Sequence, residues 1–175
     1  AYGFHVPLDE LHVDGIRDIA EDDIRFAAEM GYRIKLLGMI EHHDGAVEVS
    51  VGPVLVPRDR LLAAVSGENN AVLVQGDVVG DTLYYGKGAG RDATASAVIA
   101  DVVQAARNRV SGCATRIPAF AAHDSYGEMQ RPYGKTSARH YLRASLMNEA
   151  GVLGKVVTIL GEHGISIQSM IQKEY

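Results

Sequence analysis

The chain has 175 residues, 47% of them apolar and 22% charged, and a formal net charge of −5, proportions that exclude wholesale disorder. No apolar stretch reaches the ~18 residues needed to cross a bilayer, and the acidic balance argues against a nucleic-acid partner, so we expect neither a membrane nor a nucleic acid to be bound. The single cysteine, Cys113, can form neither an internal disulfide nor a cysteine-rich zinc site, which favours a reducing, cytoplasmic location.

Residues 1–110 are predicted to form an α+β unit, a mixed and largely antiparallel sheet with covering helices. A helix at 21–30 is indicated by three acidic residues in its first turn and by Gly31 at its C′ position. Asp44-Gly45 is a hairpin signal, and residues 46–51 alternate as a half-buried strand does. The other expected elements are short helices at 14–19 and 57–64, strands at 33–39, 71–75 and 82–85, and a long helix at 94–110 with a broad apolar face.

A segment of weak periodicity, residues 111–139, separates this unit from the end of the chain. It is punctuated by Pro, Gly and Ser, and we interpret it as a linker; an irregular part of one domain is the alternative. Net charge changes across it, from −7 in residues 1–110 to +2 in residues 111–175. Both ends of the chain break off in mid-pattern, so we expect a piece of a longer protein.

Residues 140–175 are predicted to form a β-α-β unit, with strands at 140–146 and 165–171, a turn at 148–150 and a helix at 152–163. Gly164 is expected at the C′ position of that helix. Such a unit is half of a ferredoxin-like fold and buries little by itself.

A run of alternating glycines is the sharpest candidate site. Gly86, Gly88 and Gly90 lie where a predicted strand leads directly into a helix. Glycines allow close backbone approach, and a helix N-terminus offers free N–H groups to an anion or an amide, such as part of a dinucleotide. The G-x-G-x-G spacing is not the Rossmann fingerprint. A glycine-rich turn at a crowded junction is the alternative.

The other chemistry-bearing residues are weaker candidates. His42 and His43 are adjacent on a strand and point to opposite faces, so we expect no metal site there. His123-Asp124 lacks a nearby nucleophile, and Cys113 has no basic cluster beside it. The turn that begins at Asn148 offers small residues and backbone N–H groups; plain helix capping and a carboxylate-binding site both fit it.

Three motifs together resemble homoserine dehydrogenase over residues 1 to about 110. They are Gly31-Tyr32-Arg33-Ile34-Lys35-Leu36-Leu37-Gly38, then Val54-Leu55-Val56-Pro57, and Gly88-Ala89-Gly90 followed by Ala93-Thr94-Ala95-Ser96-Ala97-Val98. Residues 140–175 resemble the first half of an ACT domain, the regulatory module that bacterial members often carry at this position. The resemblance divides the chain into part of a substrate and dimerisation domain at 1–110, a linker at 111–139 and a partial ACT domain at 140–175.

The resemblance implies an oxidoreductase that uses NAD or NADP to interconvert L-homoserine and L-aspartate 4-semialdehyde, on the route to threonine and methionine. It implies a cofactor contact at Gly90, with Gly88 and Ala89 shaping the same turn. It also implies an amino-acid effector, threonine being the usual inhibitor. The residues that would bind the effector are Asn148, Gly151, Val152 and Leu153.

No residue of this chain matches a catalytic role of the family. Its nucleotide-binding domain, its catalytic lysine and the acidic residues that hold homoserine precede the position matched by Ala1, and Lys35 matches a strand residue of the sheet. We therefore expect the chain alone to transfer no hydride and to self-associate as a homo-oligomer. The alternatives are a non-catalytic amino-acid sensor and a purely structural oligomerisation module. Tight threonine binding without cofactor binding would favour the sensor.

Overall fold

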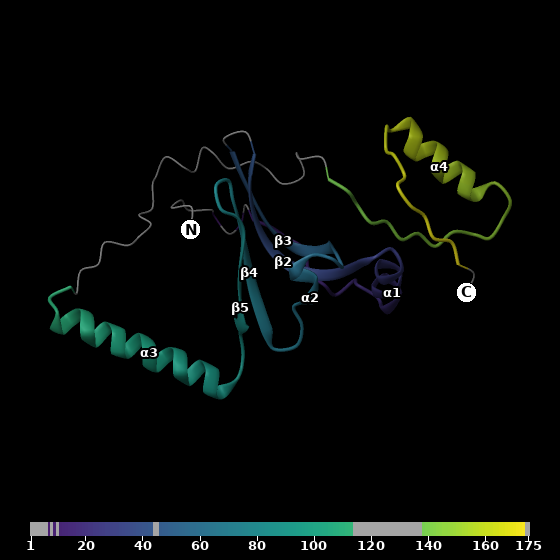
Figure 1. The fold of residues 1–175 in the computed structure, drawn as a ribbon. Helices are drawn as coiled ribbons and strands as arrows, with labels where there is room; N and C mark the ends of the chain where they lie inside the picture. The colour runs from purple at the N-terminus through teal and green to yellow at the C-terminus, as the bar shows by residue number, and fades with distance from the viewer. Residues whose placement is uncertain (1–6, 8, 10, 44–45, 114–137, 174–175) are drawn as a thin grey trace.

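The computed structural model describes residues 7, 9, 11–43, 46–113 and 138–173 and confirms an α+β fold (Figure 1). The predicted Asp44-Gly45 turn, His123-Asp124 and most of the predicted linker lie outside the described residues. Within the described part, no helix is long and apolar enough to cross a membrane.

Strand β3, Ala46–Pro57, is the centre of a three-stranded sheet with the order β1-β3-β2. It pairs antiparallel with β2, Tyr32–His43, from Tyr32↔Pro57 to His43↔Ala46. On its other edge it pairs in parallel with the two-residue strand β1, His12–Val13. The face that the alternation predicted to be wet or paired carries Glu48 and Ser50, and both are buried.

The segment at residues 14–19 was predicted to be a short helix, and that prediction is wrong. It forms a turn in which the N–H of Ile19 donates to the carbonyl of Ile16, and the N–H of Asp14 donates to the carbonyl of Val51. Because β1 pairs with β3 and the N–H of Asp14 bonds to Val51, the backbone at the start of this segment is extended and is not free to begin a helix.

Helix α1, Glu21–Glu29, packs against β2. Its expected acidic first turn is present, and the N–H of Ala20 donates to Oδ2 of Asp23 over 2.8 Å, one half of a capping box. Gly31 ends the helix with φ +86°, a conformation that favours glycine. The short helix α2, Leu61–Ala64, lies against β2 and β3 and is half as long as the range predicted for it. The buried apolar residues of the described chain are Ala27, Val47, Val56 and Ala63.

Strands β4, Asn69–Gly76, and β5, Gly80–Lys87, form a second antiparallel sheet of their own. They pair from Asn69↔Lys87 to Gly76↔Gly80. The predicted antiparallel strands are therefore divided between two sheets. Strand β5 leads to the predicted glycine run.

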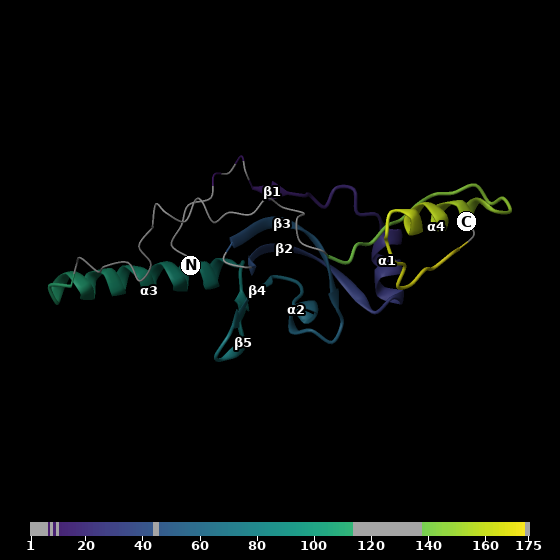
Figure 2. The same cartoon turned by 90° about the horizontal axis from the view of Figure 1, so that it is seen from above.

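Helix α3, Arg91–Val110, begins three residues before its predicted start and extends away from both sheets (Figures 1 and 2). It has no buried residue, so it is not a covering helix within the described chain. The predicted apolar face exists but is exposed, with Val98 at 55%, Ile99 at 63% and Val102 at 62%.

Helix α4, Val152–Glu162, confirms the predicted helix of the last unit, and Gly164 follows it with φ +70°. The strands predicted on either side of it, at 140–146 and 165–171, are not formed. In a ferredoxin-like sheet the strands of such a unit gain their ladders from neighbouring strands. Within the described residues no strand lies beside either segment.

Candidate functional site

A surface pocket of about 370 Å³ lies where β5 passes into α3, at the predicted glycine run. Its lining consists of Glu68, Lys87, Ala89, Gly90, Arg91, Asp92 and Ala93. The N–H of Gly88 donates to the carbonyl of Glu68 over 2.9 Å, which ties the run to the start of β4. Two of the three predicted cofactor residues thus line one hollow, and the third lies beside it.

Gly90 is the N-cap of α3 and has φ +118° and ψ +136°. This backbone conformation is close to the region that only glycine adopts without strain. The first bond of the helix runs from the N–H of Thr94 to the carbonyl of Gly90 over 3.0 Å. The N–H groups of Arg91, Asp92 and Ala93 come before that bond, so they have no acceptor within the helix. All three residues line the pocket at the N-terminal end of this 20-residue helix.

Gly88 is favoured for a different reason. A Cβ at this position would lie 1.6 Å from Nδ2 and 2.4 Å from Cγ of Asn70. Asn70 lies on the neighbouring strand, opposite Gly86. The glycine therefore leaves room for the exposed side chain of Asn70, which would have to shift if residue 88 carried a Cβ.

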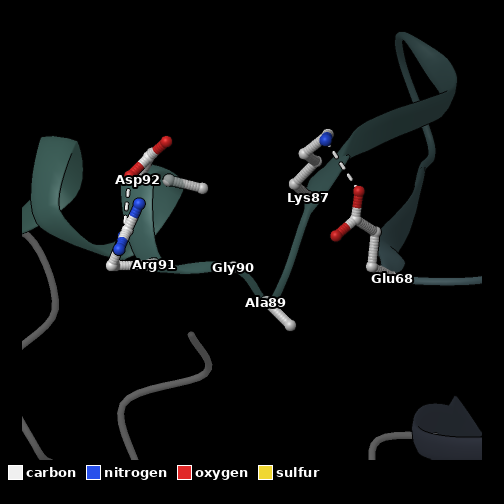
Figure 3. A pocket seen from close by; sticks show the side chains of 7 residues that line it. Glu68, Lys87, Ala89, Gly90, Arg91 and Asp92 are labelled. Atoms are coloured by element: carbon white, nitrogen blue, oxygen red, sulfur yellow. Dashed lines mark hydrogen bonds and ion pairs between the residues drawn. The ribbon is translucent and has the colours of Figure 1, made fainter.

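The charges around the pocket are already paired (Figure 3). Nζ of Lys87 lies 2.6 Å from Oε1 of Glu68, and Nε of Arg91 lies 3.3 Å from Oδ1 of Asp92. The two pairs stand on either side of the Ala89–Gly90 backbone. Formal charge at the pocket is therefore zero, and both pairs are exposed to solvent, where such pairs contribute little. The arrangement fits a polar, uncharged group such as a carboxamide better than a pyrophosphate.

The predicted effector turn is present at the start of α4, but its N-cap is Gly151 with φ +88°, not Asn148. Asn148 lies three residues earlier, before the turn in which the N–H of Val152 donates to the carbonyl of Glu149. The first helical bond runs from Lys155 to Gly151, so the N–H of Leu153 precedes it. Asn148 and Gly151 are exposed, and Val152 and Leu153 are half-buried.

A buried carboxylate that sequence analysis missed joins the two parts of the chain. Asp23 is 4% exposed, and its Oδ1 accepts the hydroxyl of Tyr141 at 2.9 Å and Nε of Arg143 at 2.6 Å. The Arg143 hydrogen bonds lower the pKa of Asp23, although its burial opposes them. Burial, and then the Asp23 carboxylate, raise the pKa of Tyr141 to about 12. The sequence signal was only an acidic first turn and a Tyr-x-Arg pair in a presumed strand.

The remaining candidates gather into no site. Among the residues that the structure describes, no three His, Cys, Asp or Glu side chains are placed to hold a metal ion. Cys113 is a free, exposed thiol. Lys35 donates to the carbonyl of Val65, at the end of α2, which accounts for it as a structural residue of β2.

Comparison with known families identifies both parts of the chain. The homoserine dehydrogenase family model matches residues 1–103, and the ACT domain model matches residues 140–174. Similar curated proteins include the homoserine dehydrogenases of Pseudomonas aeruginosa, 42% identical, and Neisseria gonorrhoeae, 40% identical. Both alignments cover 99% of this chain but 41% and 40% of the relative, so the chain spans about two fifths of the length of these proteins.

Solved structures agree with this assignment. A homoserine dehydrogenase from Thiobacillus denitrificans matches with a TM-score of 0.75 and 36% identity, over 98% of this chain and 40% of that one. A homoserine dehydrogenase of S. aureus, crystallised at pH 7.5, matches 69% of this chain and 29% of its own with a TM-score of 0.55 and 38% identity. Since the family model covers more than half of its residues, this chain belongs to the homoserine dehydrogenase family and continues into an ACT domain.

Proposed function

We propose that this chain is part of an oxidoreductase that interconverts L-homoserine and L-aspartate 4-semialdehyde with NAD or NADP. In that enzyme it would contact the nicotinamide cofactor and bind a regulatory amino acid. The observation that carries the proposal is the glycine turn at Gly88–Gly90. It combines a glycine N-cap with positive φ, helix N–H groups that precede the first helical bond, and a surface pocket, in a chain of this family. Such an activity would supply homoserine for threonine and methionine synthesis. We propose a cytoplasmic location, which the free thiol of Cys113 supports.

The residues at the pocket fit the nicotinamide end of such a cofactor. The backbone of Ala89 and Gly90 and the first N–H groups of α3 would hold its carboxamide. When bound, the dinucleotide supplies the hydride acceptor or donor, and this part of the chain binds and orients it. The paired charges of Lys87–Glu68 and Arg91–Asp92 border the same hollow without giving it a net charge.

We propose that the ACT part binds an amino-acid effector, with threonine as the first candidate, at Asn148, Gly151, Val152 and Leu153. Support comes from Gly151, the left-handed N-cap of α4, which as a glycine places no side chain beside the first turn of the helix. The N–H of Leu153 then faces the turn and can donate to an α-carboxylate.

Hydride transfer by the 175-residue chain tests the proposal most directly. Homoserine-dependent reduction of NAD or NADP, followed at the nicotinamide absorbance, is expected to be absent from the 175 residues alone. It is expected to be present in the full encoded protein, because the homoserine dehydrogenase of Pseudomonas aeruginosa extends well beyond the region that this chain matches. Turnover by the 175 residues alone would contradict the division of labour proposed here.

A threonine titration of both forms separates the enzyme from a sensor. For the enzyme we expect the encoded protein to bind cofactor as well as threonine and to lose turnover as threonine saturates. Tight threonine binding by a protein that binds no nicotinamide cofactor would instead establish a non-catalytic amino-acid sensor. A protein that binds neither would be an oligomerisation module.

A further inference from the structure

We propose that helix α1 is the docking surface for residues 138–173 of the same chain, and that Asp23 is the residue that anchors them there. The contact is independent of the proposed activity. Nothing in the chemistry at Gly88–Gly90 uses Asp23, and the carboxylate is nonetheless buried and fully engaged.

The anchoring end of α1 shares one carboxylate between two parts of the chain. Oδ2 of Asp23 accepts the N–H of Ala20 at 2.8 Å and Nη2 of Arg143 at 3.3 Å, while Oδ1 accepts Tyr141 and Nε of Arg143. The guanidinium of Arg143 thus meets the carboxylate with two nitrogens, the geometry that makes such pairs strong. The side chain of Asp23 is 6% exposed, so water replaces its partners poorly.

The other end of α1 is held by a different segment. Lys173 pairs with Glu29 and lies 5.7 Å from the centre of the Phe26 ring, and the hydroxyl of Ser169 donates to the sulfur of Met30 over 3.8 Å. Residues 141–143 precede α4 and residues 169–173 follow it. The two segments on either side of α4 therefore contact the two ends of the nine-residue helix α1. Contacts at both ends fix the orientation of the ACT part as well as its position.

The contacts at the two ends of α1 differ in burial. Lys173 and Glu29 keep 37% and 38% of their side-chain surface exposed, where ion pairs contribute little. Asp23 is the buried member of the set, and removing Arg143 leaves its carboxylate with two neutral donors and without a cation beside it. We therefore place the anchoring role at Asp23 and give the far end of the helix an orienting role.

A distance measurement between the two parts tests the proposal. Spin labels at Arg58→Cys, in the first part, and Lys155→Cys, on α4, are introduced into the full encoded protein after Cys113 and any other reactive cysteine are replaced by serine. The unaltered docking contact is expected to give one narrow distance distribution. Arg143→Gln, which leaves the Ala20–Asp23 bond of α1 untouched, is expected to abolish the narrow peak and to produce a broad population.

Two further variants keep the result interpretable. Arg139→Gln removes an exposed positive charge from the same segment and is expected to preserve the narrow peak. Tyr141→Phe removes a single hydrogen bond and is expected to broaden the distribution less than Arg143→Gln does, and it remains available if Arg143→Gln fails to fold. A narrow peak retained in Arg143→Gln would overturn the proposal. So would the same narrow distance, sensitive to Arg143→Gln, in a mixture of singly labelled chains, because the occupant of α1 would then be a second copy.

The pH range of docking gives a second readout. The groups that face Asp23 are Arg143, Tyr141 and, on its own helix, Asp22. Because the pKa of Asp23 is lowered in the docked state, the carboxylate stabilises docking fully at pH values above the ordinary pKa of an aspartate. This stabilisation is lost as pH falls through the lowered pKa. Because the pKa of Tyr141 is raised to about 12, the protonated hydroxyl stabilises docking fully at pH values below the ordinary pKa of a tyrosine. This stabilisation is lost as pH rises toward 12. The narrow peak should therefore persist between about pH 4 and pH 10; loss of docking inside that window would overturn the assignment to these groups.

Discussion

Replacing Gly90 with alanine is expected to raise the Michaelis constant for the nicotinamide cofactor in the full encoded protein. At φ +118° and ψ +136° an alanine is strained by about 1–3 kcal/mol. If the turn relaxes to a permitted conformation, the N–H groups at the start of α3 move away from the pocket. At 1.4 kcal/mol per factor of ten, this strain corresponds to a loss of affinity of about 5- to 140-fold. Steady-state kinetics with varied cofactor at saturating homoserine measure it.

Gly86→Ala is the matched control for that experiment. Gly86 lies in the same glycine run, but a Cβ added there meets nothing within 4 Å and its φ is not positive. Its Michaelis constant for the cofactor is expected to stay within about twofold of the wild-type value, as surface substitutions away from special backbone positions usually do. An equal rise in both variants, or no rise in Gly90→Ala, would show that the left-handed turn does not position the cofactor.

The elements that sequence analysis predicted correctly are those with signals inside a few residues. Acidic residues in the first turn and a glycine after the last turn mark α1, and the structure shows both. Strands β2 and β3 occur where predicted, each longer than its pattern indicated, because long antiparallel pairing satisfies backbone groups beyond the alternating residues. Helix α4 follows the same rule, with its glycine at residue 164.

Errors arose where structure depends on partners distant in the sequence. The two-residue strand β1 exists only because β3 lies beside it, and nothing between residues 11 and 20 indicates that pairing. The extended segments around α4 have strand-like composition but no neighbour to supply a ladder within the described residues. The division into two sheets also depends on which strands meet, and periodicity does not contain that information.

The candidate site divides in the same way. The glycine turn was predictable because a strand, three spaced glycines and a helix are consecutive, and its geometry follows from glycine's conformational freedom. The Asp23 cluster was not, because its members are 118 and 120 residues apart. An aspartate in the first turn of a helix normally complements the helix dipole, and only the fold shows that this one is buried against the ACT part.

Self-association of the 175-residue chain through α3 is the second large effect we expect. The described chain buries few apolar side chains, while α3 exposes Val98, Ile99, Val102 and Val103 along one face. A contiguous exposed apolar face favours association in water. Burying Ile99 and Val102 contributes roughly 1.5–3 kcal/mol each, so Ile99→Glu with Val102→Glu should weaken self-association by about 100-fold or more. Sedimentation equilibrium across the micromolar range measures the change.

The matched control adds the same two carboxylates to the opposite side of the helix. Ala97 and Gln104 lie about half a turn away from the apolar face, given 3.6 residues per turn. Ala97→Glu with Gln104→Glu therefore changes net charge equally without covering Ile99 or Val102, and it should leave the association constant close to that of the unaltered chain. Equal weakening by both pairs of substitutions would attribute the effect to charge repulsion. A chain that sediments as a monomer before any substitution would show that this face does not drive association.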